Sequence, residues 1–378
     1  MNRLFCFFIV LVINNSVVAQ VIYETIESSK LGESREIKIQ LPRGYDPDGD
    51  IIYPLFVVLD GDYLFEPVIG NVDYHSYWGD MPKSIVVGVN QSETRNNDLS
   101  YSGETYFPSN EGSRFFEFVS MEVIPYVNEQ YLTSEFRIVV GHDLSANFLN
   151  YYLFKEKPLF RGYISLSPDL APEMANRLIE RLTTTQEDAF YYMATGTEDV
   201  DRLKQSIIEL DNGLKVIENP KLHYRFDNFE DADHYSLVGL GIPKAINEIF
   251  SLFRPINKAE YKDKILTFEG SPFEYLVKKY EDIELFYGFE KKVVENDLRA
   301  IAAASKKKND VESMKELSKL ARKEFSESMI SAYYLGQYYE MDGNMKKALQ
   351  NYQSGLLLKE SEFITKDMLL DKIYDLKE

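Results

Sequence analysis

Four residues at three places along the chain carry side chains that could together do nucleophilic chemistry. Asp143 follows the apolar run 138–140, Glu198 and Asp199 follow a later apolar run, and His234 lies in a polar segment further on. The order nucleophile, acid, histidine is typical of a hydrolytic triad, in which the acid orients the histidine and the histidine acts as a base. We therefore predict Asp143 at the nucleophile position, Asp199 as the acid with Glu198 as the alternative, and His234 as the base.

The residues around Asp143 indicate how its side chain would be presented. The β-branched run 138–140 predicts a buried strand, and apolar residues at helical spacing over 144–152 predict a helix, so the chain must turn abruptly between them. This is the outline of a nucleophile elbow, in which small residues beside the apex let strand and helix approach closely. Asp143 occupies the apex in place of serine, and Ser145 occupies the position of the second glycine.

This elbow and the strand that follows it resemble a known family. The runs Gly141-His142-Asp143-Leu144 and Ile164-Ser165-Leu166-Ser167-Pro168 are similar to the Gly-His-Ser-x-Gly elbow and the Ile-Ser-x-Ser-Pro strand end of the Putative esterase family of α/β-hydrolases. Bacterial members of that family include siderophore esterases of the ferri-enterobactin type. The resemblance implies an α/β-hydrolase fold and an esterase-like hydrolase that acts on a small-molecule substrate without a cofactor. The sequence departs from the family at the apex, Asp143.

The resemblance also implies which residues surround the apex. Gly61 and Asp62 follow a continuous apolar strand and match the turn from which the family supplies a backbone N–H to the oxyanion hole. His142 and Leu144 flank the apex as pocket residues. An ordinary strand-to-helix loop is the alternative for 61–62, because a backbone donor leaves no side-chain signature.

Arg95 is the remaining candidate pocket residue. It lies in the segment 93–99, which resembles the Thr-Arg-x-x-Asp-Leu sequence of the same family. We expect Arg95 to pair with Asp98 and so to brace this loop over the site. A solvated charge on the loop is the alternative for Arg95.

The elements that would position these residues form a mainly parallel sheet. Continuous apolar runs predict strands buried on both faces, and segments with helical periodicity separate them, among them 115–127 and 173–182. Strands that alternate with helices imply an α/β fold with helices on both faces of the sheet. Before them, alternating patterns within 22–41, such as the one at 36–41, predict a half-exposed antiparallel edge strand. The predicted buried strands are 53–59, 84–90, 136–140, 163–166 and 190–194.

A second, helical unit follows Pro255. No strand pattern follows it, and 332–355 has the tetratricopeptide (TPR) pattern of a large residue, Leu-Gly, Tyr, Ala and a further aromatic residue. One repeat cannot bury its own face, so we expect the helices over 283–325 to act as degenerate neighbours. This tail could bind a protein partner, cap the hydrolase domain or form a dimer. We divide the chain into a signal peptide, an α/β-hydrolase domain and a small all-helical TPR-like domain, at residues 1–19, 20–255 and 256–378.

The N-terminus and the composition bear on localisation and partners. A basic start, an apolar stretch and small residues before Gln20 describe a secretory signal peptide, with a retained membrane anchor as the alternative. We therefore expect a secreted or periplasmic protein with no membrane contact after cleavage. The single cysteine, Cys6, lies in this segment, so the mature chain would have no disulfide and no cysteine-based site. The net charge of −19 disfavours nucleic acid as a partner.

An aspartate at the apex allows several interpretations. It could attack an ester-like or other carbon electrophile, forming an ester that water activated by His234 then cleaves, as in haloalkane dehalogenases and epoxide hydrolases, which share this fold. Alternatively, Asp143 has removed the nucleophile, and the protein is a catalytically silent binding or scaffolding relative. Ser145 as a substitute nucleophile would point into the helix. A metal site formed by Asp143, His234 and Asp199 has no signature in the spacing, and we expect no metal.

Overall fold

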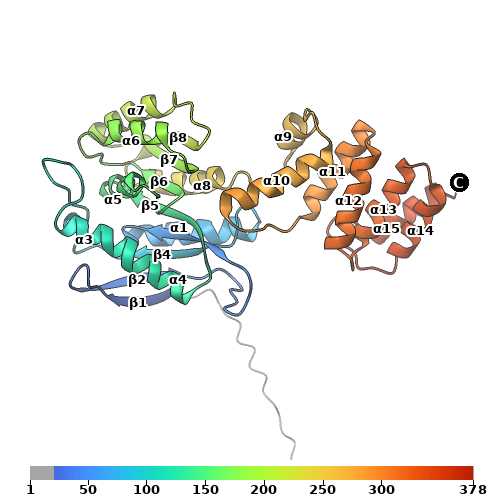
Figure 1. Ribbon diagram of the computed structural model, residues 1–378, viewed down its shortest axis with the longest axis horizontal. Helices are drawn as coiled ribbons and strands as arrows, with labels where there is room; N and C mark the ends of the chain where they lie inside the picture. The colour runs from blue at the N-terminus through green and yellow to red at the C-terminus, as the bar shows by residue number, and fades with distance from the viewer. Residues whose placement is uncertain (1–20, 378) are drawn as a thin grey trace, which may run out of the picture.

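One eight-stranded sheet forms the centre of the larger domain. The computed structural model describes residues 21–377, so the predicted signal peptide lies outside the described residues. The strand order is β1-β2-β4-β3-β5-β6-β7-β8, in which all pairs from β4 to β8 are parallel (Figure 1). The strands are β1 (Val21–Glu27), β2 (Ser34–Gln40), β3 (Tyr53–Val58), β4 (Ile85–Val89), β5 (Thr133–His142), β6 (Gly162–Leu166), β7 (Ala189–Glu198) and β8 (Leu222–Asp233).

The N-terminal hairpin differs from its predicted form. The segment 22–41, predicted to hold an edge strand, forms both β1 and β2, and β2 pairs antiparallel with β1 on one side and with β4 on the other. The edge position belongs to β1, along which half-buried and exposed residues alternate after its first two residues. The predicted segment therefore forms two strands instead of one, and only β1 lies at the edge of the sheet, because β2 is covered on both sides.

Helices cover both faces of the sheet, as predicted for an α/β fold. Side chains alternate along the buried strands between two hydrophobic cores, with Phe56 and Val58 in one and Leu55 and Val57 in the other. The first core is closed by α1 (Gly61–Tyr77) and α8 (Ser236–Ile249). The second is closed by α3 (Glu111–Phe118), the π-helix η1 (Val119–Val123), α4 (Ile124–Gln130), α5 (Leu144–Phe148), the 3₁₀ helix η2 (Leu149–Phe154), α6 (Met174–Thr184) and α7 (Asp201–Leu214).

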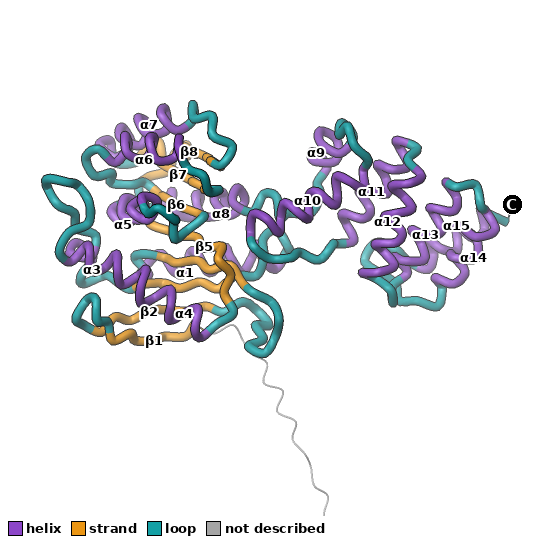
Figure 2. The backbone as a smooth tube through the Cα atoms, viewed as in Figure 1, coloured by secondary structure: helices purple, strands orange, loops and turns teal. Residues whose placement is uncertain are grey.

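The C-terminal region is helical, as predicted, and it projects away from the sheet (Figure 2). No helix within residues 21–377 is long and apolar enough to cross a membrane. The elements of this region are α9 (Lys258–Glu260), the π-helix η3 (Tyr261–Ile265), α10 (Pro272–Tyr287), α11 (Glu295–Lys308), α12 (Val311–Glu324), α13 (Met329–Met341), α14 (Met345–Gly355) and α15 (Lys366–Asp375).

Helix α10 joins the two regions through their cores. Leu276, near its start, belongs to the core of the helical region, whereas Ile283 and Tyr287 belong to the core under α1 and α8. The Tyr287 hydroxyl also donates a hydrogen bond of 2.8 Å to the carbonyl of Ile249. Hydrophobic packing therefore continues past residue 255, where the sequence pattern places the domain boundary.

The tail packs α13 against α14 at the segment that carries the tetratricopeptide-like pattern. A Cβ at Gly336 would lie 2.3 Å from the buried ring of Tyr352, so only glycine allows this approach. Ala348 is fully buried in the same core. The small and aromatic residues of the pattern therefore have a packing role, and the assignment of the tail to the tetratricopeptide class stays a prediction.

Candidate functional site

The chain turns sharply at Asp143, between β5 and α5. Strand β5 ends at His142, Asp143 has φ 60° and ψ −120°, and α5 begins at Leu144. A non-glycine residue in this backbone conformation is strained, and such strain is concentrated at functional sites. A Cβ at Gly141 would lie 2.5 Å from the carbonyl oxygen of Ser145, which explains why glycine precedes the turn. The predicted strand, turn and helix are thus all present, with Asp143 at the apex.

The Asp143 carboxylate faces an arginine. Its Oδ2 accepts a hydrogen bond of 3.3 Å from Nη1 of Arg95, and the side chain is 24% exposed. The backbone at Asp143 is fixed by a bond from its N–H to the carbonyl of Leu166 and by a bond from the Asp169 N–H to its carbonyl. Within residues 21–377, no hydrogen bond joins Asp143 to His234, and Oδ1 of Asp143 has no hydrogen-bond partner.

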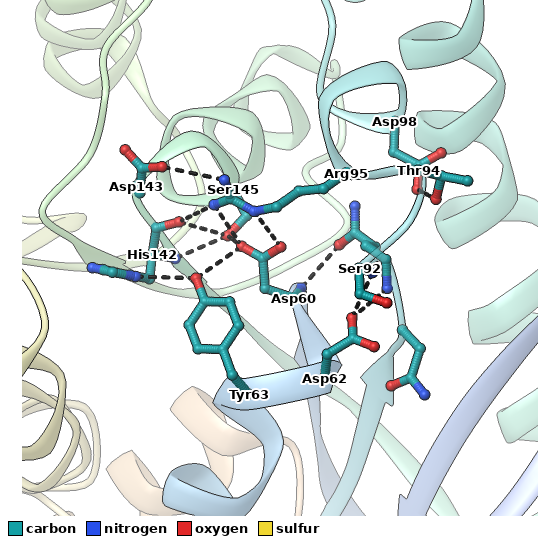
Figure 3. A network of polar contacts seen from close by, with 12 residues as sticks. Asp60, Asp62, Tyr63, Ser92, Thr94, Arg95, Asp98, His142, Asp143 and Ser145 are labelled. Atoms are coloured by element: carbon teal, nitrogen blue, oxygen red, sulfur yellow. Dashed lines mark hydrogen bonds and ion pairs between the residues drawn. The ribbon is translucent and has the colours of Figure 1, made fainter.

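Arg95 is held by a second, buried carboxylate. Its Nε and Nη2 donate to Oδ1 and Oδ2 of Asp60 at 2.7 and 3.0 Å, and Nη2 also donates to the carbonyl of His142 (Figure 3). Burial by itself lowers the pKa of Arg95, but the hydrogen bonds and charge of Asp60 outweigh it and raise the pKa. Asp60 is 1% exposed and also accepts a hydrogen bond of 2.7 Å from the hydroxyl of Ser145. Ser145 is therefore buried and occupied in bracing the turn.

The predicted pairing of Arg95 with Asp98 is wrong. Asp98 accepts hydrogen bonds from Nη1 of Arg35, at 2.6 Å, and from the hydroxyl of Thr94, at 2.7 Å. Arg35 comes from β2, so the pair ties the short helix α2 (Arg95–Asp98) to the sheet. Both Arg35 and Asp98 are buried, which leaves Arg95 to turn toward the apex instead.

His234 and Asp199 form the predicted pair. Nδ1 of His234 lies 2.9 Å from Oδ1 of Asp199, which also accepts from the N–H of Val200, and Oδ2 of Asp199 accepts from the hydroxyl of Thr195. The hydrogen bond to Asp199 raises the pKa of His234 against the effect of burial. Burial would raise the pKa of Asp199, but its hydrogen bonds lower it well below the usual range. Glu198, the alternative acid, is exposed at the end of β7, so only Asp199 meets His234.

Ser167 completes this pair and was not predicted as a site residue. Its Oγ lies 3.0 Å from Nδ1 of His234, its side chain is fully buried, and its φ is 43°. The only signal in the sequence is its place in the Ser-x-Ser-Pro run at the end of β6. The hydroxyl limits the freedom of the His234 ring.

His142 supports His234 from the other side. Its Nε2 lies 2.9 Å from the carbonyl oxygen of His234, and its Nδ1 lies 3.0 Å from the hydroxyl of Tyr63. Because a carbonyl oxygen can only accept, Nε2 carries the proton and Nδ1 is an acceptor. The single hydroxyl hydrogen of Tyr63 is shared between this Nδ1 and Oδ2 of Asp60, which lies 3.2 Å away. Burial and the nearby charge of His234 lower the pKa of His142, which favours this neutral form. Tyr63, on the first turn of α1, was not predicted.

The other predicted pocket residues lie at helix starts. Gly61 is the buried first residue of α1, and Leu144 is the first residue of α5. The Asp62 carboxylate accepts hydrogen bonds from the N–H groups of Gln91 and Ser92, so this side chain braces the loop after β4. Asp60, which sequence analysis missed, is the polar residue that ends the apolar run of β3.

The three residues considered for a metal do not form such a site. Among residues 21–377, no cluster of three or more histidine, cysteine, aspartate or glutamate side chains is arranged to hold a metal ion. His234 and Asp199 are close together, whereas Asp143 is turned toward Arg95.

The fold and the site define the class of protein. A mostly parallel sheet covered by helices, with a strained apex after β5, an acid after β7 and a histidine after β8, is the arrangement of an α/β-hydrolase. The Putative esterase family matches residues 28–217, and the chain belongs to this family. Among curated proteins, none matches the sequence.

Several solved structures are similar to this chain. An uncharacterised protein from Capnocytophaga ochracea is 33% identical with a TM-score of 0.81, and 95% of this chain and 99% of that chain are covered. An IroE-like serine hydrolase from Shewanella oneidensis is 21% identical with a TM-score of 0.61, covering 80% and 98%. The siderophore hydrolase EstA from Aspergillus nidulans is 16% identical with a TM-score of 0.54, covering 67% and 100%. The last two likenesses concern the fold.

Proposed function

We propose that this protein is a binding member of the esterase family that does not hydrolyse esters by the serine route. The observation that carries the proposal is the ion pair between Asp143 and Arg95 at the apex. A serine at this position would need His234 as its base, and Asp143 makes no hydrogen bond to His234 within residues 21–377. The carboxylate therefore serves as a fixed acceptor in the site.

The chemistry of a carboxylate supports the same proposal. Attack of Asp143 on an ordinary ester would expel an alkoxide and leave an acid anhydride, which is a poor intermediate compared with the acyl ester that serine forms. The contact with Arg95 also makes Oδ2 of Asp143 a weaker nucleophile, because its lone pair accepts a charge-assisted hydrogen bond. Ser145 does not replace it, since its hydroxyl is fully buried and bonded to Asp60.

A second candidate function is hydrolysis with Asp143 as a carbon nucleophile. The pair of His234 and Asp199 favours it, because a binding protein has no chemical need for a histidine oriented by a buried acid. In that route Asp143 attacks an electrophilic carbon and expels a halide or opens an epoxide. Water activated by His234 then cleaves the covalent ester. This route requires Asp143 to leave Arg95 at the moment of attack.

One experiment separates the two functions. The purified protein, Asp143→Ser and His234→Ala are incubated with short-chain aryl esters, an epoxide and a haloalkane, and followed by intact mass spectrometry and by product formation. The binding function predicts no turnover and no adduct in the parent, with ester hydrolysis gained in Asp143→Ser. An adduct on Asp143 that accumulates in His234→Ala, with turnover in the parent, would establish the nucleophilic function instead.

Two wider aspects of the function are proposals of the same kind. Export to the periplasm or the medium is supported by the N-terminal sequence pattern, and fractionation of cells with N-terminal sequencing of the product tests it.

A protein partner for the tail is supported by the tetratricopeptide-like pattern at 332–355. Recovery of the same partner by the full chain, and its loss in a variant with exposed tail residues changed, would test the second.

A further inference from the structure

The charges and aromatic side chains around the apex indicate what kind of ligand the site takes. We propose that Asp143 receives the primary ammonium group of a small organic cation, with Tyr63 and Tyr235 against the carbon skeleton. This inference rests on the proposed binding function, and it names the chemical class of the ligand.

The first argument is that one guanidinium serves two carboxylates. Asp60 takes two hydrogen bonds from Arg95, at 2.7 and 3.0 Å, and a third from the hydroxyl of Ser145. Asp143 receives one contact from Arg95, at 3.3 Å, and it is the carboxylate that reaches solvent. The charge of Arg95 is therefore compensated mainly by Asp60. Asp143 keeps a partly exposed negative charge, and its Oδ1 accepts no hydrogen bond within residues 21–377. A positively charged N–H group of a ligand could donate a hydrogen bond to this oxygen and balance the charge of Asp143.

The second argument is that the neighbouring charges do not neutralise Asp143. Asp169, whose N–H bonds to the Asp143 carbonyl, is already paired with Arg202 at 2.6 and 2.8 Å. Asp199 is paired with His234. Together with Asp60, the site holds the four carboxylates of Asp60, Asp143, Asp169 and Asp199 and the two guanidinium groups of Arg95 and Arg202. The net charge of these groups is two negative charges with His234 neutral and one with His234 protonated. A carboxylate ligand would be repelled there, whereas an ammonium ligand would be attracted.

The third argument is the presence of two exposed aromatic rings around the side chain of His142. Tyr63 is 45% exposed and Tyr235 is 78% exposed, and their ring centroids lie 5.9 and 6.4 Å from that of His142, the residue before Asp143. The Tyr63 hydroxyl bonds to His142 and Asp60, which fixes its ring. Such rings suit an ammonium ligand, because the face of an aromatic ring attracts a cation and packs on adjacent carbon atoms.

The four histidines of the chain allow a direct test by NMR. His142 and His234 lie at the site, whereas His75 contacts Asp80 and His223 contacts Asp188, away from the site. The purified protein is titrated with 2-phenylethylammonium, with neutral 2-phenylethanol and with 3-phenylpropanoate, and the imidazole C–H signals are followed. We expect saturable shifts of His142 and His234 with the cation alone, and constant signals from His75 and His223.

Two pairs of variants make the test specific. Asp143→Asn keeps the shape and removes the charge, and we expect its dissociation constant for the cation to rise about tenfold or more. Asp201→Asn removes a charge from a side chain that is 98% exposed at the start of α7, and we expect less than a twofold change. Tyr235→Ala should weaken binding several-fold, whereas Tyr23→Ala, which removes a tyrosine 59% exposed on the edge strand β1, should not.

The outcomes separate this inference from the proposed function. Equal affinity for the neutral alcohol and the cation, preference for the carboxylate, or unchanged affinity in Asp143→Asn would overturn the ammonium site while leaving a silent hydrolase fold. Absence of saturable shifts with all three probes would also overturn it. A covalent adduct on Asp143 in the mass-spectrometric experiment would overturn the proposed function itself, whatever the cation does.

Discussion

Arg95 donates to both Asp60 and Asp143, and this shared guanidinium is the main structural feature of the apex. Arg95 thereby links the end of β3 to the turn after β5. It is 35 residues from Asp60 and 48 residues from Asp143 in the sequence. In an active serine hydrolase the residue at the apex interacts with the histidine of the triad. Here the apex side chain interacts with a cation, and the ring of His234 interacts with Asp199 and the hydroxyl of Ser167.

Loss of Arg95 should destabilise the protein strongly. The change Arg95→Ala leaves the Asp60 side chain, 2% exposed, without its cation, and an unpaired buried charge costs about 3–5 kcal/mol. As a control, Arg43→Ala breaks an ion pair whose side chains are 60% and 37% exposed, so we expect little change in the free energy of unfolding. Urea unfolding measures both. A similar small effect at the two positions would contradict the importance of the Arg95 pair.

The pair of His234 and Asp199 should make stability depend on pH. The pKa of His234 is raised in the folded protein, so its contribution is complete below its ordinary pKa of 6.5 and is lost as pH rises through the raised value. The pKa of Asp199 is lowered, so its contribution is present above 3.8 and is lost as pH falls toward the lowered value. The pair therefore stabilises the fold most between these two limits.

Urea unfolding of the parent, His234→Gln and Asp199→Asn across pH 4 to 9 checks this dependence. We expect the free energy of unfolding of the parent to fall above pH 6.5 more steeply than that of either variant. A parent profile parallel to both variants in that range would show that the pair does not contribute.

The strain at Asp143 should appear as a difference between two substitutions. Asp143→Gly and Asp143→Ala both remove the contact with Arg95, but only glycine adopts φ 60° and ψ −120° without strain. We expect Asp143→Gly to be more stable than Asp143→Ala by about 1–2 kcal/mol, measured by thermal and urea unfolding. If the alanine variant is equally stable, the backbone at the apex is not strained in solution.

Gly336 provides a test of the packing in the tail. A Cβ at this position would lie 2.3 Å from the ring of Tyr352, so Gly336→Ala should cost about 1–3 kcal/mol through overpacking. The control Gly239→Ala, in α8, meets nothing within 4 Å and should stabilise by about 0.5–1 kcal/mol. The midpoint of thermal unfolding distinguishes them. A shift in the same direction for both would argue against the close contact of α13 and α14.

The sequence by itself determined the parts of this protein that depend on local pattern. Continuous apolar runs such as 53–59 fixed the buried strands, because side chains on both faces of these strands enter a core. The apex at Asp143 followed from a strand, a glycine and a helix pattern in succession, and the order of acid and histidine indicated Asp199 and His234. These features are encoded within a few residues of one another or by chain order.

Only the tertiary structure decided which groups meet. The partner of Arg95 is Asp60 and not Asp98, because Arg35 from β2 already satisfies Asp98. Asp199 rather than Glu198 meets His234, because consecutive side chains leave the chain in different directions. Contacts of this kind join elements that are far apart in sequence. They depend on the register and twist of the whole sheet, which no short segment specifies.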